Sequence, residues 1–183
     1  MDRMTSQEPG EGGDHGTVRR ATPGDESIVR SVRLDALADA PDDFDSTLER
    51  ELRWTTSDWQ KWLSRGATFV LEGLDGGKGI AAGVPNRNDP EEVFLMSMWV
   101  HPELRGTGVA DKLVAPVLSW SEAEGATGVW LHVVKDNNRA RRFYARNGFR
   151  LTGREVVRER DGTVEMEMHH PLDRRLADVD RKE

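Results

Sequence analysis

The spacing of apolar residues divides most of the chain into alternating helices and strands. Apolar positions recur at helical spacing from Ile28 to Leu37, and again in a second region from Leu48 to about Ser64. Two further helical patterns cover residues 108–124 and 138–147. Runs rich in β-branched and aromatic residues predict strands at 17–21, 67–72, 78–84, 92–100, 129–134, 150–158 and 163–169. This order predicts a mixed α/β sheet with helices on both faces.

Three details within these elements carry further expectations. The run from Glu92 to Val100 is almost continuously apolar, which predicts a central strand buried on both faces. Pro116 falls inside the longest helix, where it removes a backbone hydrogen bond and predicts a kink two turns after the helix begins. Gly148 follows the last helix at the position where a left-handed residue commonly ends a helix.

The two ends of the chain contain too few apolar residues to join a core. Met1–Gly16 is rich in glycine and acidic residues and is predicted to be disordered. Asp173–Glu183 is a highly charged run, so we expect a frayed helix or a tail there. The predicted folded unit is therefore residues 17–172, one domain of ordinary size.

The composition argues against several classes of protein. With 26 basic and 33 acidic residues the net charge is −7, which argues against a nucleic-acid binder. The chain contains no cysteine, so disulfides, thiolate nucleophiles and cysteine metal sites are excluded. No apolar run approaches the ~18 residues of a membrane span, and the acidic N-terminus is unlike a signal peptide, so we expect a cytoplasmic protein. The pair His169-His170 has no evident third ligand, so we expect no metal site.

A turn between a strand and a helix carries the first chemical signal. The strand that ends at Val100 leads into Arg105-Gly106-Thr107-Gly108-Val109-Ala110, which opens directly onto the longest helix. The N–H groups of a first helical turn lack intrahelical acceptors, and with the helix dipole they form an anion site. The two glycines and the small Ala110 let a bulky ligand approach, and the arginine adds a charged contact. We expect a pyrophosphate here, although a plain strand-to-helix turn can also contain two glycines.

A second segment, from Asn137 to Phe149, follows the strand at 129–134. On a helix, Ala140 and Tyr144 lie four positions apart on one face, with Phe143 beside them. Ala140 is small enough for a ligand to pass over it. Tyr144, the only tyrosine in the chain, then places a phenol near that passage. The alternative for Tyr144 is a ring packed in the core with its hydroxyl group satisfied.

Together the two segments resemble the Gcn5-related N-acetyltransferase (GNAT) family. Residues 105–110 match its Arg/Gln-x-x-Gly-x-Gly/Ala signature, and Asn137-x-x-Ala140-x-x-x-Tyr144-x-x-x-Gly148-Phe149 is similar to its second block. The resemblance covers about residues 17–170. It implies a mostly antiparallel central sheet in which the strands ending at Val100 and Val134 splay apart, with acetyl-CoA in the gap between them.

The resemblance also implies roles for single residues. The pantetheine arm would follow the backbone of residues 98–100 and contact Asn137, and the pyrophosphate would lie on residues 105–110. Tyr144 would lie near the thioester sulfur as the general acid, and Arg142 or Arg139 would reach the adenosine 3′-phosphate unless they only form a solvated helix face. The predicted cofactor-binding residues are Met98, Trp99, Val100, Arg105, Gly106, Thr107, Gly108, Val109, Ala110, Asn137, Ala140 and Phe143.

The residues support direct acyl transfer in a ternary complex, because no cysteine is present to form an acyl-enzyme. An acceptor amine, with a pKa near the ~10.4 of lysine, must lose a proton to a base or to water before it attacks. A phenol of pKa ~10, here Tyr144, can protonate the leaving thiolate. One base candidate is His132, whose strand lies beside the gap but can point it to either face. The others are Glu92 and Glu91, which begin the strand at the other side of the gap and could act through water.

The acceptor is predicted only as a class. The loop from Asp42 to Ser46 borders the acceptor site in the family, so Phe44 and Asp45 are the expected contacts; its acidity indicates a cationic or amine acceptor, or else a solvated loop. We expect a small-molecule amine first, and a protein N-terminus or lysine second. The rival interpretations are a CoA-binding regulatory or sensing protein without turnover, and a nucleotide-binding protein. Family members are often homodimers, and the last hairpin offers an edge strand that can pair.

Overall fold

The computed structural model describes residues 16–173 of the chain. The predicted tails, residues 1–16 and 173–183, lie outside this range except for Gly16 and Asp173. Within residues 16–173, no helix is long and apolar enough to cross a membrane.

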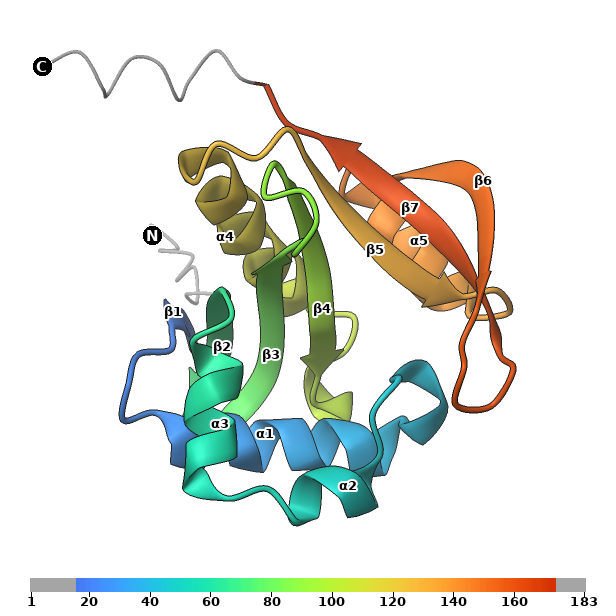
Figure 1. Ribbon diagram of the computed structural model, residues 1–183. Coiled ribbons are helices and arrows are strands. Elements are labelled where there is room, and N and C mark those ends of the chain that lie inside the picture. The colour runs from blue at the N-terminus through green and yellow to red at the C-terminus, as the bar shows by residue number, and fades with distance from the viewer. Residues whose placement is uncertain (1–15, 174–183) are drawn as a thin grey trace, which may run out of the picture.

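A single seven-stranded sheet forms the centre of the molecule, in the order β1-β2-β3-β4-β5-β7-β6 (Figure 1). Every neighbouring pair is antiparallel except β4 and β5, which are parallel. The predicted mixed, mostly antiparallel fold is thereby confirmed. The strands are β1 Thr17–Arg20, β2 Ala67–Gly73, β3 Gly76–Pro85, β4 Glu92–Val100, β5 Gly128–Val134, β6 Arg150–Val157 and β7 Val164–Pro171.

The two central strands separate along their length, as the resemblance implies. The β4–β5 ladder contains three residue pairs, from Glu92 opposite Gly128 to Phe94 opposite Trp130. Beyond Phe94 the strands diverge, and Figure 1 shows β4 and β5 opening away from each other. The backbone of β4 after Phe94 therefore has no ladder partner on the β5 side, which leaves room for a ligand between the two strands.

Helices cover both faces of the sheet. On one face α1 (Glu26–Asp39) and α3 (Thr56–Leu63) pack their apolar residues against Val70, Ile80 and Trp99. On the other face α4 (Val109–Ala123) packs against Phe69 and Leu71, and α5 (Asn138–Arg146) packs beside it. Phe69 and Leu71 of β2 thus face one core and Val70 faces the other, because successive side chains of a strand point to opposite faces of the sheet. A short helix, α2 (Leu48–Leu52), and two 3₁₀ turns, η1 (Pro41–Asp43) and η2 (Pro102–Leu104), complete the fold.

Two expectations from the sequence need correction. The helical region predicted from Leu48 to about Ser64 is two helices, because Thr55 and Asp58 form a reciprocal capping box that begins α3. The strand β4 is not buried on both faces: Val93 and Leu95 are buried, but Met96 is 43% exposed. Its apolar run continues past Phe94 into the splayed region, where Met96 borders the cleft.

The longest helix begins and ends as predicted, within one residue at each end. It runs unbroken through Pro116, whose neighbours Leu113, Val114 and Val117 are fully buried. The kink itself stays a prediction. At the end of α5, Gly148 adopts the predicted left-handed conformation, with φ of +86°.

Candidate active site

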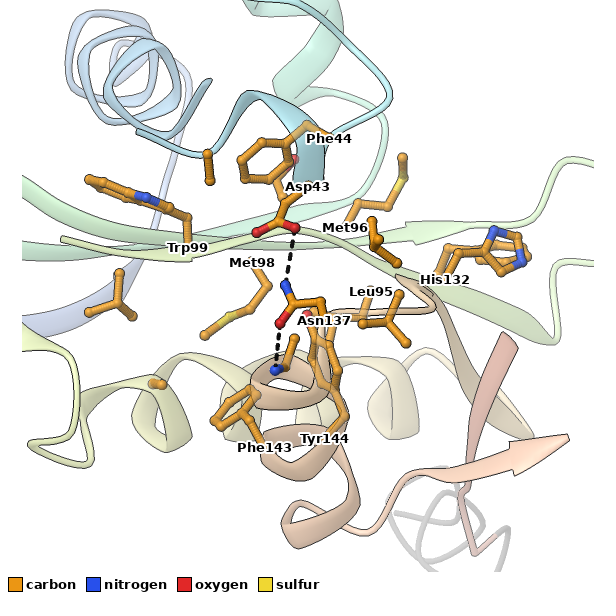
Figure 2. Close-up of a pocket in the computed structure, with 18 of the residues that line it drawn as sticks. Asp43, Phe44, Leu95, Met96, Met98, Trp99, His132, Asn137, Phe143 and Tyr144 are labelled. Carbon is orange, nitrogen blue, oxygen red and sulfur yellow. Dashed lines mark hydrogen bonds between the residues drawn. The ribbon is translucent and has the colours of Figure 1, made fainter. Parts of the chain in front are cut away.

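The splay between β4 and β5 opens into a large cleft of about 1140 Å³. Its walls come from β4, β5, α5, the turn before α4 and the loop that contains η1. Figure 2 shows Asp43 and Phe44 on one side of this cleft, and Asn137, Phe143 and Tyr144 on the other. The cleft is larger than the ~300–1,000 Å³ of most small-molecule pockets, so it has room for a large ligand and a second reactant.

A β-bulge in β4 shapes the wall of the cleft. Ile80 pairs with Trp99, whereas Ala82 pairs with Met96, so β4 contains one extra residue opposite Ala81. Ser97, within the bulge, has a left-handed φ of 58° and borders the cleft. Such a bulge bends the strand and redirects backbone groups away from the ladder. The sequence did not predict it, because Ser97 is neither Gly nor Asn.

The three predicted β4 contacts all border the cleft, but their side chains differ in direction. Met98 packs beside the core around α4, whereas the indole of Trp99 is buried in the core around α1. The Trp99 Nε1–H donates to Oδ2 of Asp39 at 2.8 Å. Trp99 is therefore placed to meet a ligand through its backbone.

The predicted anion site has the expected local geometry. Gly106 and Gly108 have φ of +85° and +87°, and Gly108 is the N-cap residue of α4. A Cβ atom built on either glycine would meet no atom within 4 Å, so open space lies in front of both. With Ala110 they border the cleft. A helix N-terminus with exposed backbone and a positive dipole end thus faces the cavity.

Two residues of the turn do not border the cleft. The Thr107 hydroxyl donates to the carbonyl of Leu104 at 2.7 Å, which turns it back onto η2. The side chain of Val109 is 1% exposed and packs in the core. Any contact of these two residues with the predicted pyrophosphate would therefore be made by their backbone, and it stays a prediction.

The arginine of the turn is already paired within the protein. Its Nε–H donates to the carbonyl of Val100 at 3.0 Å, and its Nη2 pairs with Oδ2 of Asp39. Burial acts to raise the pKa of Asp39, but the hydrogen bonds from Trp99 and Arg105 outweigh it and hold the pKa below its usual value. Arg105 borders the cleft. A phosphate contact by Arg105 must therefore compete with Asp39.

The second motif segment lies along the opposite wall. Asn137 caps α5, because its Oδ1 accepts from the Ala140 N–H at 3.0 Å. Its Nδ2 donates to Oδ1 of Asp43 across the cleft at 3.0 Å (Figure 2). Ala140 and Phe143 border the cleft on the same helix, as do Arg139 and Arg142.

Tyr144 also borders the cleft, with its ring edge-on to Phe143 and Phe149 at centroid distances of 5.2 and 5.8 Å. The ring is half-buried and packs beside the main core. Burial, and then the negative charge of Asp43, raise the pKa of the phenol above its ordinary value. Tyr144 is thereby kept in its protonated form.

The three base candidates have different positions. His132 borders the cleft, with its ring 5.7 Å from that of Phe94 and its Nε2 3.6 Å from Oε2 of Glu167. Glu92 lies where β4 and β5 are still paired, and it accepts a hydrogen bond from Asn86 at 2.7 Å. Neither Glu92 nor Glu91 borders the cleft. Both glutamates precede the splay, so either could act as the base only through water, and that role stays a prediction.

The loop around η1 borders the cleft through Asp43, Phe44 and Asp45, as predicted for Phe44 and Asp45. Two arginines of the β6–β7 turn hold this loop by its carbonyl groups: Arg158 Nη2 donates to Asp42 at 2.9 Å, and Arg160 donates to Ser46 and Pro41 at 3.4 Å each. Sequence reasoning missed this contact, because it joins segments more than 110 positions apart.

Glu165 is a further residue that the sequence reasoning missed. It lies on β7 opposite Val134 of β5, and its side chain, 13% exposed, borders the cleft. The only local signal was the alternation of Glu165 and Glu167 with Met166 and Met168, which indicates a two-faced strand and nothing about a cleft. Within residues 16–173, the structure contains no group of three or more His, Asp or Glu residues arranged for a metal ion.

Comparison with known proteins agrees with this geometry. The model of the Acetyltransferase (GNAT) family matches residues 33–149. An uncharacterized N-acetyltransferase of Mycobacterium tuberculosis is 31% identical over 119 residues, which cover 65% of this chain and 75% of the relative. A mycothiol acetyltransferase of Brachybacterium faecium is 32% identical over 133 residues, covering 69% of this chain but 38% of that protein.

Solved structures share the fold at lower sequence identity. An acetyltransferase of the GNAT family from Streptococcus pneumoniae aligns with a TM-score of 0.73 at 16% identity, over 86% of this chain and 99% of that one. The protein yncA of Salmonella typhimurium, solved with its cofactor acetyl-CoA, aligns with a TM-score of 0.71 at 18% identity, over 86% and 94% of the two chains. With the family model matching well over half of its length, the chain belongs to the GNAT family of acetyltransferases.

Proposed function

We propose that this protein transfers an acetyl group from acetyl-CoA to an amine acceptor by direct attack in a ternary complex. The observation that carries the proposal is the continuity of one cleft, which joins the open N-terminal turn of α4 to the protonated phenol of Tyr144. In a long acyl donor such as acetyl-CoA, the phosphates and the reactive carbonyl lie far apart. One cavity that contains both a phosphate site and an acid can bind the two ends of such a donor.

The residues of the cleft fit acetyl-CoA at several points. The first turn of α4 offers backbone N–H donors for the pyrophosphate, and the open space at Gly106 and Gly108 allows the phosphate oxygens to approach. Arg139 and Arg142 add positive charge on α5 at the same cavity. The unpaired edge of β4 after Phe94 can form strand-like hydrogen bonds with the amide groups of the pantetheine arm.

When bound, acetyl-CoA supplies a thioester whose carbonyl carbon an amine can attack. Tyr144 holds a proton for the leaving sulfur, because its raised pKa keeps the phenol neutral. Backbone N–H groups of β4 beside the Ser97 bulge can stabilise negative charge on the carbonyl oxygen. Asn137 holds α5 to the η1 loop and so fixes the distance between the two walls.

A cationic amine fits the acceptor end best. Asp43 and Asp45 of the η1 loop and Glu165 of β7 bring three carboxylates to this part of the cleft. An amine is protonated in free solution and is attracted to such a site before it loses its proton. We infer that a small amine is the primary acceptor, and that a protein N-terminus or lysine is the second candidate.

The test is a calorimetric titration with acetyl-CoA, followed by an assay of CoA thiol release in the presence of spermidine, tryptamine, and peptides with a free N-terminal alanine or an internal lysine. The unaltered protein is expected to bind acetyl-CoA at one site and to release thiol with at least one amine. Gly108→Trp, which fills the open space at the turn, is expected to lose binding. Binding without release would instead favour a CoA-binding protein without turnover, and absence of binding would overturn the proposal.

A further inference from the structure

Glu165 is a largely enclosed carboxylate that borders the cleft and that neither family motif contains. In the sheet it lies opposite Val134 of β5 on one side and Val156 of β6 on the other. Val134 is the last residue of the strand that diverges from β4, so Glu165 lies at the open end of the splay. Its side chain is 13% exposed although it borders the cleft, so most of it is enclosed by protein.

The surroundings of Glu165 leave its carboxylate without a hydrogen bond. Arg158 Nη1 lies 3.3 Å from Oε1 but forms no hydrogen bond in the described part of the chain. The other guanidinium nitrogens of Arg158 donate to Asp161 Oδ1 and to the carbonyl of Asp42, at 3.0 and 2.9 Å. Among residues 16–173 no hydrogen bond to either oxygen of Glu165 is formed, so the group has free acceptor capacity toward the cleft.

Charged groups from three segments face Glu165: the β6–β7 turn, β5 and the η1 loop. Arg158 and His132 stabilise its ionised form, whereas Asp45 and Asp161 oppose it. Burial is the largest influence, and it raises the pKa of Glu165 above the ordinary value for glutamate. The next residue on the same face of β7 is Glu167, which Thr152 and Arg154 contact from β6. A carboxylate of raised pKa is a stronger proton acceptor than an exposed one.

The other acidic groups near the cleft are less suited to accept a proton. Glu92 is outside the cleft and holds Asn86. Asp43 accepts a hydrogen bond from Asn137. Asp39 binds both Trp99 and Arg105, which hold its pKa below the usual value. Asp45 also borders the cleft, but it is exposed to solvent. Glu165 borders the cleft, is largely enclosed by protein and accepts no hydrogen bond from the described residues, its ion-pair partner being Arg158 Nη1 at 3.3 Å.

We propose that Glu165 is the general base that takes a proton from the acceptor amine, an inference that rests on the acetyltransferase function proposed above. The Glu165 carboxylate accepts one proton from the ammonium group, whose N–H bond breaks. The electron pair left on nitrogen forms the new C–N bond with the thioester carbonyl carbon, the C–S bond breaks, and its electron pair stays on sulfur. Tyr144 gives sulfur a proton and recovers one from the second N–H bond; Glu165 releases its own proton to solvent.

The first measurement is independent of turnover. Glutamate labelled with ¹³C at the carboxyl carbon is incorporated into the full chain, the Glu165 signal is assigned by its loss in Glu165→Gln, and its titration midpoint is compared with the ordinary glutamate value of 4.5. The Glu165 midpoint is expected above that value. A midpoint equal to or below it would overturn the proposal.

The second measurement is the pH profile of kcat/KM for the amine that gives the fastest thiol release. Glu165→Gln is expected to lower kcat by about 10²–10⁴-fold and to remove the fall in rate toward acidic pH, with an unchanged Kd for acetyl-CoA. Glu165→Asp keeps the charge on a shorter side chain. Its kcat should therefore fall less than that of Glu165→Gln, and its rate should still fall toward acidic pH. Glu155→Gln, on exposed β6 and outside the cleft, is the matched control and should behave like the unaltered protein.

The outcomes separate the two proposals. If thiol release proceeds in Glu165→Gln within about threefold of the unaltered protein, with the acidic limb intact, Glu165 is not the base while the acetyltransferase proposal stands. If the unaltered protein releases no thiol with any amine of the panel, the proposed function fails and the role of Glu165 fails with it. Loss of acetyl-CoA binding in Glu165→Gln, with Glu165→Asp also inactive, would assign Glu165 to the structure of the cleft and overturn its role as a base.

Discussion

Asn137 donates a hydrogen bond from Nδ2 to Oδ1 of Asp43 at 3.0 Å, although the two residues are 94 positions apart. The same amide caps α5 through its Oδ1, so one side chain begins a helix and joins that helix to the η1 loop. The bond spans the cleft between the wall that contains Tyr144 and the wall that contains Phe44 (Figure 2). The width of the cleft at this point therefore depends on a residue of the second GNAT motif.

Truncating the two partners separates these roles. Asn137→Ala removes both the cap and the bond to Asp43, and it is expected to lower the free energy of unfolding by about 1–2 kcal/mol. Asp43→Ala removes only the bond and should cost about 0.5 kcal/mol, because the pair is exposed to solvent. Urea denaturation at pH 7 measures both. Equal costs for the two variants would show that the cap of α5 contributes nothing.

A buried ion pair supports Phe44 at the wall of the cleft. Arg33 binds the carboxylate of Glu51 in a forked arrangement, with Nε and Nη2 each 3.0 Å from an oxygen, and both residues are buried. The Arg33 guanidinium carbon also lies 4.7 Å from the centre of the Phe44 ring. The pair thus links the core beside α1 to a residue that borders the cleft.

Removing one member of this pair leaves a buried charge without a partner. Glu51→Ala is expected to lower the free energy of unfolding by about 3–5 kcal/mol, whereas the double variant Arg33→Met, Glu51→Leu should lose less than that. Chemical denaturation of both variants, with the exposed α2 neighbour Glu49→Ala as control, measures the difference. A double variant less stable than Glu51→Ala would contradict the ion-pair explanation.

An ion pair at the start of α1 makes stability depend on pH. Asp25 accepts hydrogen bonds from Arg19 at 2.9 and 3.0 Å and from the Thr22 N–H at 2.7 Å. The bonds from Arg19, and then that from Thr22, hold the pKa of Asp25 well below the 3.8 of a free aspartate. A folded-state pKa below the unfolded one adds stability above the unfolded value, and that stability is lost as the pH falls through the folded value.

Asp25→Asn is therefore expected to be less stable than the unaltered protein at pH 7. This difference in stability, the gap between the two proteins, should narrow as the pH falls from about 4 toward about 2. Thermal unfolding monitored by circular dichroism over this range measures the gap. Asp75→Asn, at an exposed position of the β2–β3 turn, is the control and should show no comparable gap at pH 7. A gap for Asp25→Asn that widens on acidification would contradict the argument.

The role proposed for Tyr144 has its own kinetic consequence. Tyr144→Phe keeps the ring that packs against Phe143 and Phe149 but removes the acidic proton. It is expected to lower kcat by about 10²–10³-fold and to leave the Kd of acetyl-CoA unchanged. Because burial raises the pKa of the phenol, the unaltered enzyme should keep this acid protonated up to about pH 10. A rate within threefold of the unaltered enzyme would remove Tyr144 from the mechanism.

Short-range signals explain why much of the fold and one end of the site could be predicted from sequence. The glycines at 106 and 108 and the Asn137–Tyr144 block act within single turns, so their geometry follows from local residue types. The strand and helix boundaries depend on periodicity, which is also local. The splay and the mostly antiparallel pairing came from the family resemblance, and the sheet order agrees with them.

The acceptor end could not be predicted in the same way, because its residues meet only through tertiary packing. Glu165 reaches the cleft because β7 inserts between β5 and β6. Arg105 pairs with Asp39 across 66 positions, and Arg158 holds the carbonyl of Asp42 across 116. No periodicity or motif records such contacts. For the same reason the position of Glu92 relative to the cleft could not be predicted: its distance along β4 from the point of divergence is a property of the ladder.

The two glycines that flank α4 offer a matched test of the donor site. Gly108 at the N-terminus and Gly125 after the C-terminus have φ of +87° and +84°, and a Cβ at either would meet nothing within 4 Å. Alanine at either position should cost a similar ~1–2 kcal/mol of backbone strain. Only Gly108 borders the cleft. Any difference between the two variants in acetyl-CoA binding therefore reports the ligand site and not the strain.

Gly108→Ala is accordingly expected to weaken acetyl-CoA binding by about tenfold or more, whereas Gly125→Ala keeps the affinity of the unaltered protein with a similar loss of thermal stability. The reason is that a methyl group at Gly108 enters the space in front of the first turn of α4, where the phosphates must approach the backbone N–H groups. Calorimetry and thermal melts on the two variants measure affinity and stability separately. Equal affinities would place the pyrophosphate away from this turn, and a loss of affinity in both would attribute the effect to the helix as a whole.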